Sequence, residues 1–348
     1  MKRLFIIIIT LLLIAGACLL ILLGVGYYLN TPMEGPADSG SQGIEKQGKV
    51  FQVNKGDSVS IVAHRLEKGE FIRSKYLFIG ISKIKDTQAA MKSGFYKISK
   101  AMSTIEIHDL LVAGTQKLVK VTIPEGFTAR KIAERFDGAG VCPKEDFLKA
   151  LQSPDIVKKH QIKSDSVEGY LYPDTYMFHK DLPAEKVVEH LVQTMFEKLE
   201  NIYPEYKEME PEELHDKIIL ASIVEREYRN PDEAAKIASV FYNRLKIDMR
   251  LQSCATVVYV LTEIKGEKHP EKITYNDLEV DSKFNTYEEW GLPPAPIANP
   301  GINALEAVFY PADTDYLYFL LKDQDAGRHV FSRTLSDHDN AYRLYIKQ

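Results

Sequence analysis

The first thirty residues constrain this chain more than any other part of it. No charged residue occurs between Arg3 and Glu34, and 15 of the 20 residues from Leu4 to Leu23 are Leu, Ile or Phe. A helix of about 20 apolar residues crosses a hydrocarbon layer about 30 Å thick. The sequence therefore predicts one transmembrane helix at the N-terminus.

The charges that flank this helix predict its orientation. Lys2 and Arg3 precede it, and Glu34 and Asp38 follow it, so the positive-inside rule keeps the N-terminus in the cytoplasm. A cleaved signal peptide fits less well, because the apolar run is long and no clean cleavage site follows it. A lipoprotein cysteine at Cys18 fits even less, because apolar residues continue beyond it. We expect an uncleaved anchor, with the rest of the chain in a periplasm or an exposed cell wall.

The segment 30–49 is rich in Gly, Pro and Ser and has no apolar period. This composition is typical of a flexible linker with a reach on the order of 25 Å, so we expect a tether that keeps the remaining chain near the membrane. The whole chain has 44 basic and 49 acidic residues and a net charge of −5. Because there is no basic excess, a nucleic-acid partner is not expected.

Cysteine usage adds little to the prediction. Cys18 lies in the predicted anchor, which leaves Cys142 and Cys254. One disulfide between these two is compatible with an oxidising compartment, but two cysteines do not make a disulfide framework. Two buried thiols are the favoured interpretation.

An internal repeat at an offset of 70 positions begins after the tether. The string GDSV before VAHRL returns as GFTA before IAERF. Each copy predicts a strand (50–53 and 119–123), a Gly turn, a Ser or Thr cap and a short amphipathic helix. Between the copies, residues 94–98 predict another strand, and Ser103 is placed to cap a helix that runs through position 111. Short strands with short helices on one side indicate an α+β fold.

Both copies of the repeat also resemble the opening of LysM modules, which bind glycans that contain N-acetylglucosamine. The phrases that carry this resemblance are VNKGDSVSIVAHRL and IPEGFTARKIAERF. A strand, a Gly turn and a capped helix are common in proteins, so a plain α+β packing unit is the alternative.

The string EGYLYPDTY at 168–176 packs three tyrosines and two carboxylates into nine residues. On an extended segment, alternating tyrosines place their rings on one side. Aromatic rings beside acids suit sugar rings, which have apolar faces and hydroxyl rims. A half-buried strand with a Pro turn is the alternative.

A later helix carries an acid at the end of an apolar stripe. Pro211 begins this helix, and at 100° per residue one face of it holds five residues: Leu214, Ile218, Ala221, Ser222 and Glu225. Because a water-poor environment destabilises a carboxylate, the pKa of Glu225 is expected to be raised, which suits a general acid. The alternative is an exposed Glu225 that pairs with Arg226 or Arg229.

Two further features follow this helix. Asn230 and Pro231 mark the start of a second helix, which we expect to fold back against the first as an antiparallel pair. Farther along, Asn-Thr-Tyr at 285–287 precedes a segment rich in Pro and Gly at 291–301. Such a segment predicts a rigid irregular loop, which is a common place for substrate contacts.

Taken together and in this order, the motifs resemble the YceG-like family of endolytic murein transglycosylases. The matching strings cover essentially the whole chain: EGYLYPDTY, LASIVEREY, IASVFYNRL, MRLQS, FNTY, GLPPAPIANPG and GRHVF. The resemblance implies cleavage of the β-1,4 bond between N-acetylmuramic acid and N-acetylglucosamine within peptidoglycan strands, with a 1,6-anhydro end as product. It also implies that nascent strands are terminated near the membrane and that cell-wall synthesis enzymes are partners.

The resemblance assigns the essential glutamate to the first acid after Ile-Val, which is Glu225. One carboxyl suffices where the muramyl 6-hydroxyl is the nucleophile, whereas an ordinary glycosidase uses two. Glu225 is expected to protonate the leaving oxygen and then to take the proton of the 6-hydroxyl. The residues expected to hold the glycan are Gln252, Asn285, Tyr287, Tyr172 and Asn243. Neither a metal nor another cofactor is expected.

Two departures from the family pattern occur in the matching strings. Cys254-Ala255 replaces the usual Asp-Pro, and Phe284 replaces a Tyr. Two other functions also remain open. One is a hydrolytic muramidase with the same glutamate, and the other is a non-catalytic scaffold that binds peptidoglycan.

The expected organisation is an α+β protein with four parts. These are an N-terminal tip and transmembrane anchor (1–29), a tether (30–49), a LysM-like module (50–118) and a larger α+β catalytic domain (119–348), with a second LysM-like element at about 119–150.

Overall fold

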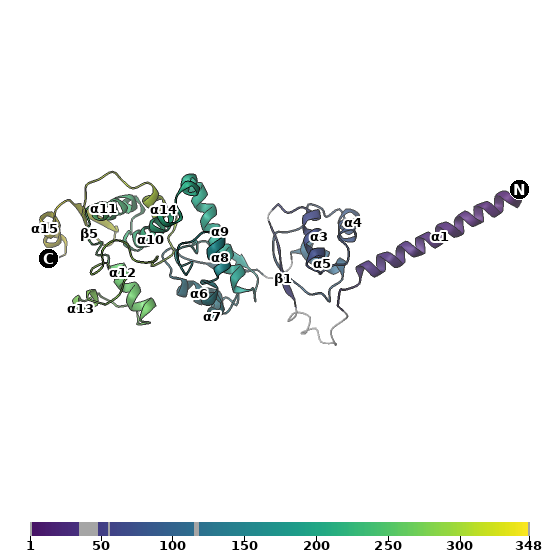
Figure 1. Ribbon diagram of the computed structural model, residues 1–348, viewed down its shortest axis with the longest axis horizontal. Coiled ribbons are helices and arrows are strands. Elements are labelled where there is room, and N and C mark those ends of the chain that lie inside the picture. The colour runs from purple at the N-terminus through teal and green to yellow at the C-terminus, as the bar shows by residue number, and fades with distance from the viewer. Residues whose placement is uncertain (1, 35–47, 55, 115–117, 347–348) are drawn as a thin grey trace. The chain divides into compact units, whose positions relative to one another are not determined.

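The computed structural model describes residues 2–34, 48–54, 56–114 and 118–346 (Figure 1). Within these ranges the chain divides into two compact units, residues 1–118 (unit 1) and residues 119–348 (unit 2). Helices alternate with three small sheets, and each sheet is an antiparallel pair of strands. The expected mixture of helix and sheet is therefore confirmed.

The N-terminal helix α1 (Lys2–Asn30) is long and apolar. Its stretch Leu13–Asn30 has a mean hydropathy of 1.9 and buries none of its residues inside the structure. Within the described ranges it is the one helix long and apolar enough to cross a membrane. A membrane explains the exposure of so many Leu and Ile side chains, so α1 is consistent with a single-pass anchor.

The first residues of the predicted tether are held against unit 1. The Asn30 side-chain oxygen accepts a hydrogen bond from the Ile105 N–H at 3.0 Å. The Arg73 guanidinium donates to the Pro32 carbonyl at 2.8 Å, and the Glu34 N–H donates to the Lys100 carbonyl at 3.1 Å. Residues 30–34 are therefore not free linker, and residues 35–47 of the predicted tether lie outside the described ranges.

Unit 1 builds its core between one strand pair and three helices. Strand β1 (Lys49–Val53) pairs antiparallel with β2 (Gly94–Ile98). The helices are α3 (Val59–Lys68), α4 (Lys75–Ile84) and α5 (Thr104–Ala113). They bury an apolar cluster with the strands, in which Leu66, Ile98 and Leu111 have no exposed surface. The predicted strands and the helices after positions 58 and 103 are confirmed, whereas α4 was not predicted.

Short polar side chains begin each of these helices. Ser58 and Ser74 accept hydrogen bonds from backbone N–H groups in the first turns of α3 and α4. Ser103 forms a capping box with Glu106 at the start of α5. Because the first N–H groups of a helix lack intrahelical partners, these caps fix where each helix starts.

Unit 2 opens with a strand pair that is covered by helices. Strand β3 (Val119–Thr122) pairs with β4 (Thr175–Phe178). Four helices belong to this part: α6 (Ala129–Gly138), α7 (Lys144–Ala150), α8 (Pro154–Lys159) and α9 (Ala184–Ile202). The predicted cap and helix of the second repeat copy are confirmed, since Thr128 accepts a hydrogen bond from the Lys131 N–H at the start of α6.

The centre of unit 2 is helix α10 (Pro211–Glu227), which packs against α11 (Ala234–Lys246) and α14 (Ile302–Phe309). Pro211 begins α10 as predicted. Asn230 caps a 3₁₀ turn, Pro231–Glu233, and α11 begins directly after that turn. Residues 218–224 of α10 are all buried, as the absence of charge in this stretch predicted.

The remaining elements of unit 2 are short. They are a 3₁₀ helix Pro204–Glu208, α12 (Cys254–Tyr259), a π-helical turn Val260–Ile264, α13 (Tyr275–Leu278), the strand pair β5 (Tyr318–Asp323) and β6 (Arg328–Ser332), and α15 (Leu335–Tyr345). The residues around α12 and α13 form a small apolar cluster of their own. The loop that follows this cluster, from position 285 to 301, leads back to α10.

Candidate active site

Glu225 lies in the last turn of α10 and is half-buried. Its Oε2 accepts a hydrogen bond from the Gly301 N–H at 2.9 Å. The Tyr228 hydroxyl lies 3.5 Å from Oε1 and 3.4 Å from Oε2. No ion pair joins Glu225 to a basic side chain in the described ranges, and Arg226 instead donates to the Gly126 carbonyl at 3.3 Å. The alternative of an exposed, ion-paired Glu225 is therefore wrong.

The surroundings of Glu225 favour its protonated form. Burial, as the largest effect, raises its pKa to about 7. The negative charge of Glu125 also raises this pKa, whereas the Gly301 N–H, the Tyr228 hydroxyl and Arg226 lower it. A carboxyl group with a pKa near 7 is protonated in a large share of molecules at neutral pH, which a general acid requires.

The loop that supplies the Gly301 N–H is fixed to α10 from within the core. The Ser222 hydroxyl, which is fully buried, accepts a hydrogen bond from the Ile297 N–H at 3.0 Å and donates to the Ile219 carbonyl. Gly301 itself is the N-cap of α14, so the carboxyl of Glu225 lies at a helix N-terminus. The position of the N–H donor thus depends on the fold of the loop as a whole.

Asn299 is the centre of this loop, and its side chain has no exposed surface. Its amide oxygen accepts from the Gly169 N–H at 2.9 Å and the Leu171 N–H at 2.8 Å. Its amide nitrogen donates to the Phe127 carbonyl at 2.9 Å and to Glu168 at 2.8 Å. The four partners of this amide lie on two other segments of the chain. Asn299 therefore joins three segments that are far apart in sequence.

Two of the predicted glycan-binding residues, Gln252 and Tyr287, lie on two loops that contact each other, and both side chains are at least partly exposed. Gln252 is exposed and adopts a left-handed backbone conformation with φ of 50°, which few non-glycine residues adopt. Its N–H donates to the Thr286 carbonyl at 3.0 Å, and this bond fixes the conformation. Tyr287 is half-buried, and its hydroxyl lies 3.0 Å from the sulfur of Cys254.

The other two predicted glycan amides hold the fold together. Asn285 has no exposed surface, and its amide nitrogen donates to the Leu278 and Val280 carbonyls, both at 2.8 Å. Asn243 donates to the Thr314 carbonyl at 2.8 Å and to the Tyr316 carbonyl at 3.0 Å. Because these amide donors already have partners, neither side chain presents them to a ligand in this structure.

The tyrosines of EGYLYPDTY do not form an exposed aromatic surface. Tyr170, Tyr172 and Tyr176 have exposed fractions of 1%, 5% and 6%. The Tyr170 hydroxyl lies 2.9 Å from the His215 ring nitrogen Nδ1, and the Tyr176 hydroxyl donates to the Tyr172 carbonyl at 2.7 Å. The interpretation of these rings as a sugar-stacking face is therefore wrong, because the rings fill the core of unit 2.

The Tyr172 hydroxyl differs from the other two, since it makes no hydrogen bond within the described residues. Burial, followed by the negative charges of Asp174, Glu125, Glu306 and Glu225, raises the pKa of Tyr172 to about 12. Tyr172 is thus near the acids around Glu225.

Two other acids with raised pKa values have structural partners. Burial raises the pKa of Glu168 to about 8, yet its carboxyl accepts hydrogen bonds from the Ala129 N–H, at 2.9 and 3.0 Å, and from Asn299. Burial also raises the pKa of Glu227, and the Ser253 hydroxyl donates to it. Both acids therefore bind segments of unit 2 to one another, whereas the contacts of Glu225 are a single N–H and two long contacts to one hydroxyl.

Three neighbours of Glu225 were not predicted. Tyr228 follows it by three positions on the helix, so the motif LASIVEREY already held that signal. Gly301 and Glu125 lie 76 and 100 positions away in the sequence, and no local pattern links them to Glu225. Only the folded chain reveals that they meet.

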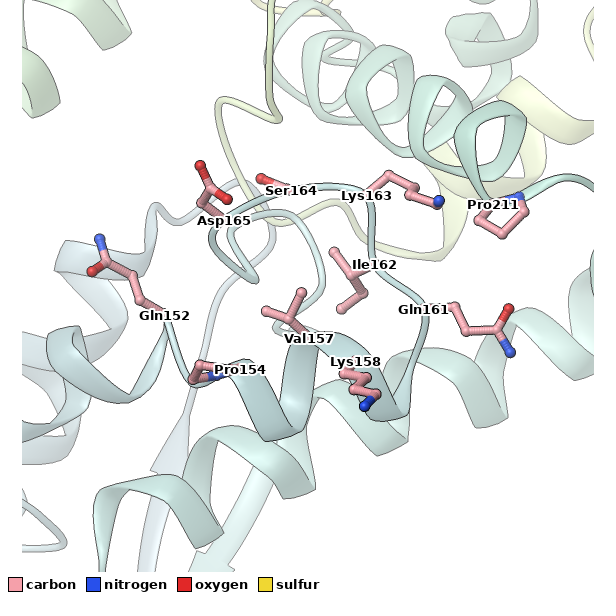
Figure 2. Close-up of a pocket in the computed structure, with 10 residues that line it drawn as sticks. All are labelled: Gln152, Pro154, Val157, Lys158, Gln161, Ile162, Lys163, Ser164, Asp165 and Pro211. Carbon is pink, nitrogen blue, oxygen red and sulfur yellow. The ribbon is translucent and has the colours of Figure 1, made fainter.

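A cavity of about 510 Å³ lies at the opposite end of α10 (Figure 2). Its lining includes Lys158, Gln161, Lys163 and Pro211, and it does not include Glu225. Glu225 lies fourteen positions after Pro211, which separates the two by about 21 Å along the helix. This cavity is therefore separate from the surroundings of Glu225.

Cys18, Cys142 and Cys254 are all free thiols in the structure. Cys142 is a free, buried thiol as expected, but the expectation of a buried Cys254 is wrong, because this free thiol is exposed beside Tyr287. In the part of the chain that the structure describes, no group of three or more His, Cys, Asp or Glu side chains is placed to hold a metal ion.

A model of the YceG-like family matches residues 51–344. The chain belongs to this family. It is 34% identical over 322 residues to a Bacillus subtilis protein named endolytic murein transglycosylase, with 87% of each chain covered. A Streptococcus pneumoniae protein of the same name is 27% identical over 91% of this chain, which spans 60% of that protein's length. A crystal structure of a YceG-like protein from Listeria monocytogenes superposes with a TM-score of 0.56 and 36% identity, over 84% of this chain and 99% of that chain.

We predict that Asn299→Ala lowers the free energy of unfolding of this family member by at least about 3 kcal/mol, because it removes the partners of buried N–H and C=O groups. Urea unfolding of the full chain in detergent, followed by circular dichroism, measures this change. Asn276→Ala is the control, since Asn276 is exposed and its side chain makes no hydrogen bond in the described ranges. A loss below about 1 kcal/mol for Asn299→Ala would contradict the central role of this amide.

Proposed function

We propose that this protein is a membrane-anchored lytic transglycosylase that cleaves the β-1,4 bond between N-acetylmuramic acid and N-acetylglucosamine within peptidoglycan strands. The observation that carries the proposal is the state of Glu225, a half-buried acid with a pKa raised to about 7 and no ion pair to a basic side chain in the described ranges. The printed names of the relatives from Bacillus subtilis and Streptococcus pneumoniae support the same substrate.

In this proposal Glu225 acts twice. First it gives its proton to the glycosidic oxygen as the bond from that oxygen to the muramyl C1 breaks. The muramyl 6-hydroxyl then attacks C1 and returns its proton to the Glu225 carboxylate, which leaves a 1,6-anhydro end and consumes no water. Between the two steps, the Gly301 N–H and the Tyr228 hydroxyl stabilise the carboxylate.

Gln252, Tyr287 and Tyr172 are the glycan contacts that we retain in the proposal. Gln252 is exposed, Tyr287 is half-buried, and the Tyr172 hydroxyl is free in the described ranges. We assign Asn285 and Asn243 a supporting role instead, because their amides bind backbone carbonyls.

We also propose that α1 is an uncleaved anchor with its N-terminus in the cytoplasm, so that unit 2 acts outside on nascent strands near synthesis enzymes. The exposed apolar surface of α1 and the charges that flank it support this placement. Protease added to spheroplasts should then digest unit 2, and protection of unit 2 would contradict the orientation. In this proposal residues 50–118 act as a LysM-like glycan-binding module, and their deletion should weaken binding to insoluble peptidoglycan.

We predict that Glu225→Gln abolishes cleavage of purified peptidoglycan, with a loss of at least about a thousandfold, because an amide is not acidic enough to protonate the leaving oxygen. Mass spectrometry should find wild-type fragments one water lighter than hydrolysis products. The rate should fall as pH rises through 7, since Glu225 loses its proton there. Because the pKa of Glu225 is raised from 4.5 to about 7, the folded protein binds this proton more tightly than the unfolded chain does. The free energy of unfolding should therefore fall as pH rises from about 4.5 to 7, and Glu225→Gln should remove this part of its pH dependence.

Glu213→Gln is the matched control, because Glu213 is an exposed acid on the same helix. It should cleave like the wild type. Hydrated ends in the wild-type products would assign a hydrolytic muramidase instead, and a folded wild type without cleavage would favour a glycan-binding scaffold.

We further predict that glycan binding changes the fluorescence of Trp290, the one Trp of the chain, which is 63% exposed on the same loop as Tyr287. The change should saturate when peptidoglycan oligosaccharides are titrated into Glu225→Gln, which binds without cutting. Adding Gln252→Ala should weaken the apparent affinity about fivefold, the effect of losing one hydrogen bond of about 1 kcal/mol.

Gln193→Ala is the control for the titration, because Gln193 is exposed on α9 and its side chain bonds only Glu197. Unchanged fluorescence during binding that calorimetry detects would place the glycan elsewhere.

A further inference from the structure

Glu125 lies in the short segment between β3 and α6, and hydrogen bonds fix the backbone directly after it. The Gly126 N–H donates to the Asn299 carbonyl at 3.0 Å, and Arg226 donates to the Gly126 carbonyl at 3.3 Å. Gly126 has a φ of 70°, and a Cβ on it would lie 3.5 Å from the Glu225 Cγ. This segment therefore passes directly over the acid of α10.

The side chain of Glu125 contacts Gly301. A Cβ on Gly301 would overlap the Glu125 carboxyl group as it lies in this structure, so a larger residue there would require the Glu125 side chain to move. An oxygen of Glu125 lies 2.0 Å from where a Cβ of Gly301 would be, and the Gly301 nitrogen lies 2.9 Å from Oε2 of Glu225. Two covalent bonds, Cβ–Cα and Cα–N, connect these points, so the nearest oxygens of the two carboxyl groups are no more than about 8 Å apart. At such a separation, two carboxylates in a site from which water is partly excluded repel each other appreciably.

The charged and titratable groups that affect Glu225 come from three parts of the chain. Arg226 and Tyr228 lie on α10 itself, Glu125 lies on the segment after β3, and Tyr172 lies before β4. The N-terminus of α14 adds the Gly301 N–H. Among these groups, Glu125 supplies the negative charge that opposes ionisation of Glu225, whereas Arg226 and the two hydrogen bonds favour ionisation.

We propose that Glu125 is a positioning residue of this active site, which holds the catalytic proton on Glu225 until a glycosidic oxygen accepts it. The proposal rests on the proposed role of Glu225 as the general acid. Its physical basis is repulsion between two nearby carboxylates, which disfavours ionisation of the more buried one. Glu125 is exposed, so its own charge remains hydrated while it acts on Glu225.

The first test is the pH dependence of peptidoglycan cleavage by the full-length protein and by Glu125→Gln. Without the negative charge Glu225 ionises at lower pH, so the alkaline limb should move down by about one pH unit. The rate at pH 7 should then fall about fivefold, while the rate at pH 5 changes little. Glu125→Asp retains the charge and should keep the wild-type profile.

Glu145→Gln is the matched control, because Glu145 is an exposed acid on α7 without an ion pair in the described ranges. It should leave the profile unchanged. The proposal would be overturned if the alkaline limb of the Glu125→Gln profile stays at the wild-type pH. It would also be overturned if the cleavage rate falls by the same factor at every pH, because a uniform loss indicates a merely structural defect.

A second measurement needs no substrate and separates this proposal from the function of the protein. Glu125→Gln, Glu225→Gln and the double variant form a double-mutant cycle in thermal unfolding. At pH 8, where both carboxyl groups are charged, either substitution removes the same repulsion. The stability gained by the double variant should therefore be smaller than the sum of the gains of the two single variants. At pH 5 the coupling should vanish. If the coupling is absent at pH 8, the proposal for Glu125 is overturned even if the enzyme is active. If instead the coupling is present but the wild-type protein does not cleave peptidoglycan, only the proposed transglycosylase function is overturned.

Discussion

The geometry around Glu225 depends on one buried amide, Asn299. This side chain joins Phe127 and the segment 168–171 to its own loop through four hydrogen bonds. The same loop delivers the Gly301 N–H to Glu225 two residues later. Because buried polar groups without partners are costly, the three segments hold one another in a single arrangement. The N–H donor and the segment with Glu125 are thereby brought to the end of α10 together.

A helix end is a favourable place for an acid that must both keep and release a proton. The inner turns of α10 are fully buried, and this withdraws water from one side of Glu225 and raises its pKa. The N-terminus of α14 meets the same carboxyl and stabilises its charged form. The two effects oppose each other, which leaves the pKa near 7 rather than at an extreme. An acid deeper in α10 would lose the second effect.

The sequence was sufficient for the parts of the fold that depend on neighbouring residues. Helix caps, the apolar face of α10 and the placement of Glu225 at its end follow from spacings of three or four positions. The roles of amides and tyrosines were not predictable in this way. Asn285 and Asn299 look alike in the printed sequence as polar residues in a loop, yet both bind backbone groups that fold into reach from elsewhere. Likewise, EGYLYPDTY has a period of two over its tyrosines, but β4 begins only at Thr175, so the rings pack inward.

A raised pKa alone does not distinguish the acid that reacts from the acids that hold the fold. Glu168, Glu225 and Glu227 all have raised pKa values through burial. Glu168 meets a helix N-terminus and the Asn299 amide, and Glu227 meets the Ser253 hydroxyl, so a change in either proton would disturb a link between segments. Within the described ranges Glu225 accepts one N–H bond, from Gly301, and contacts one hydroxyl at 3.4 Å or more, so it has fewer hydrogen bonds than Glu168. For this reason we assign the proton transfer to Glu225 rather than to Glu168 or Glu227.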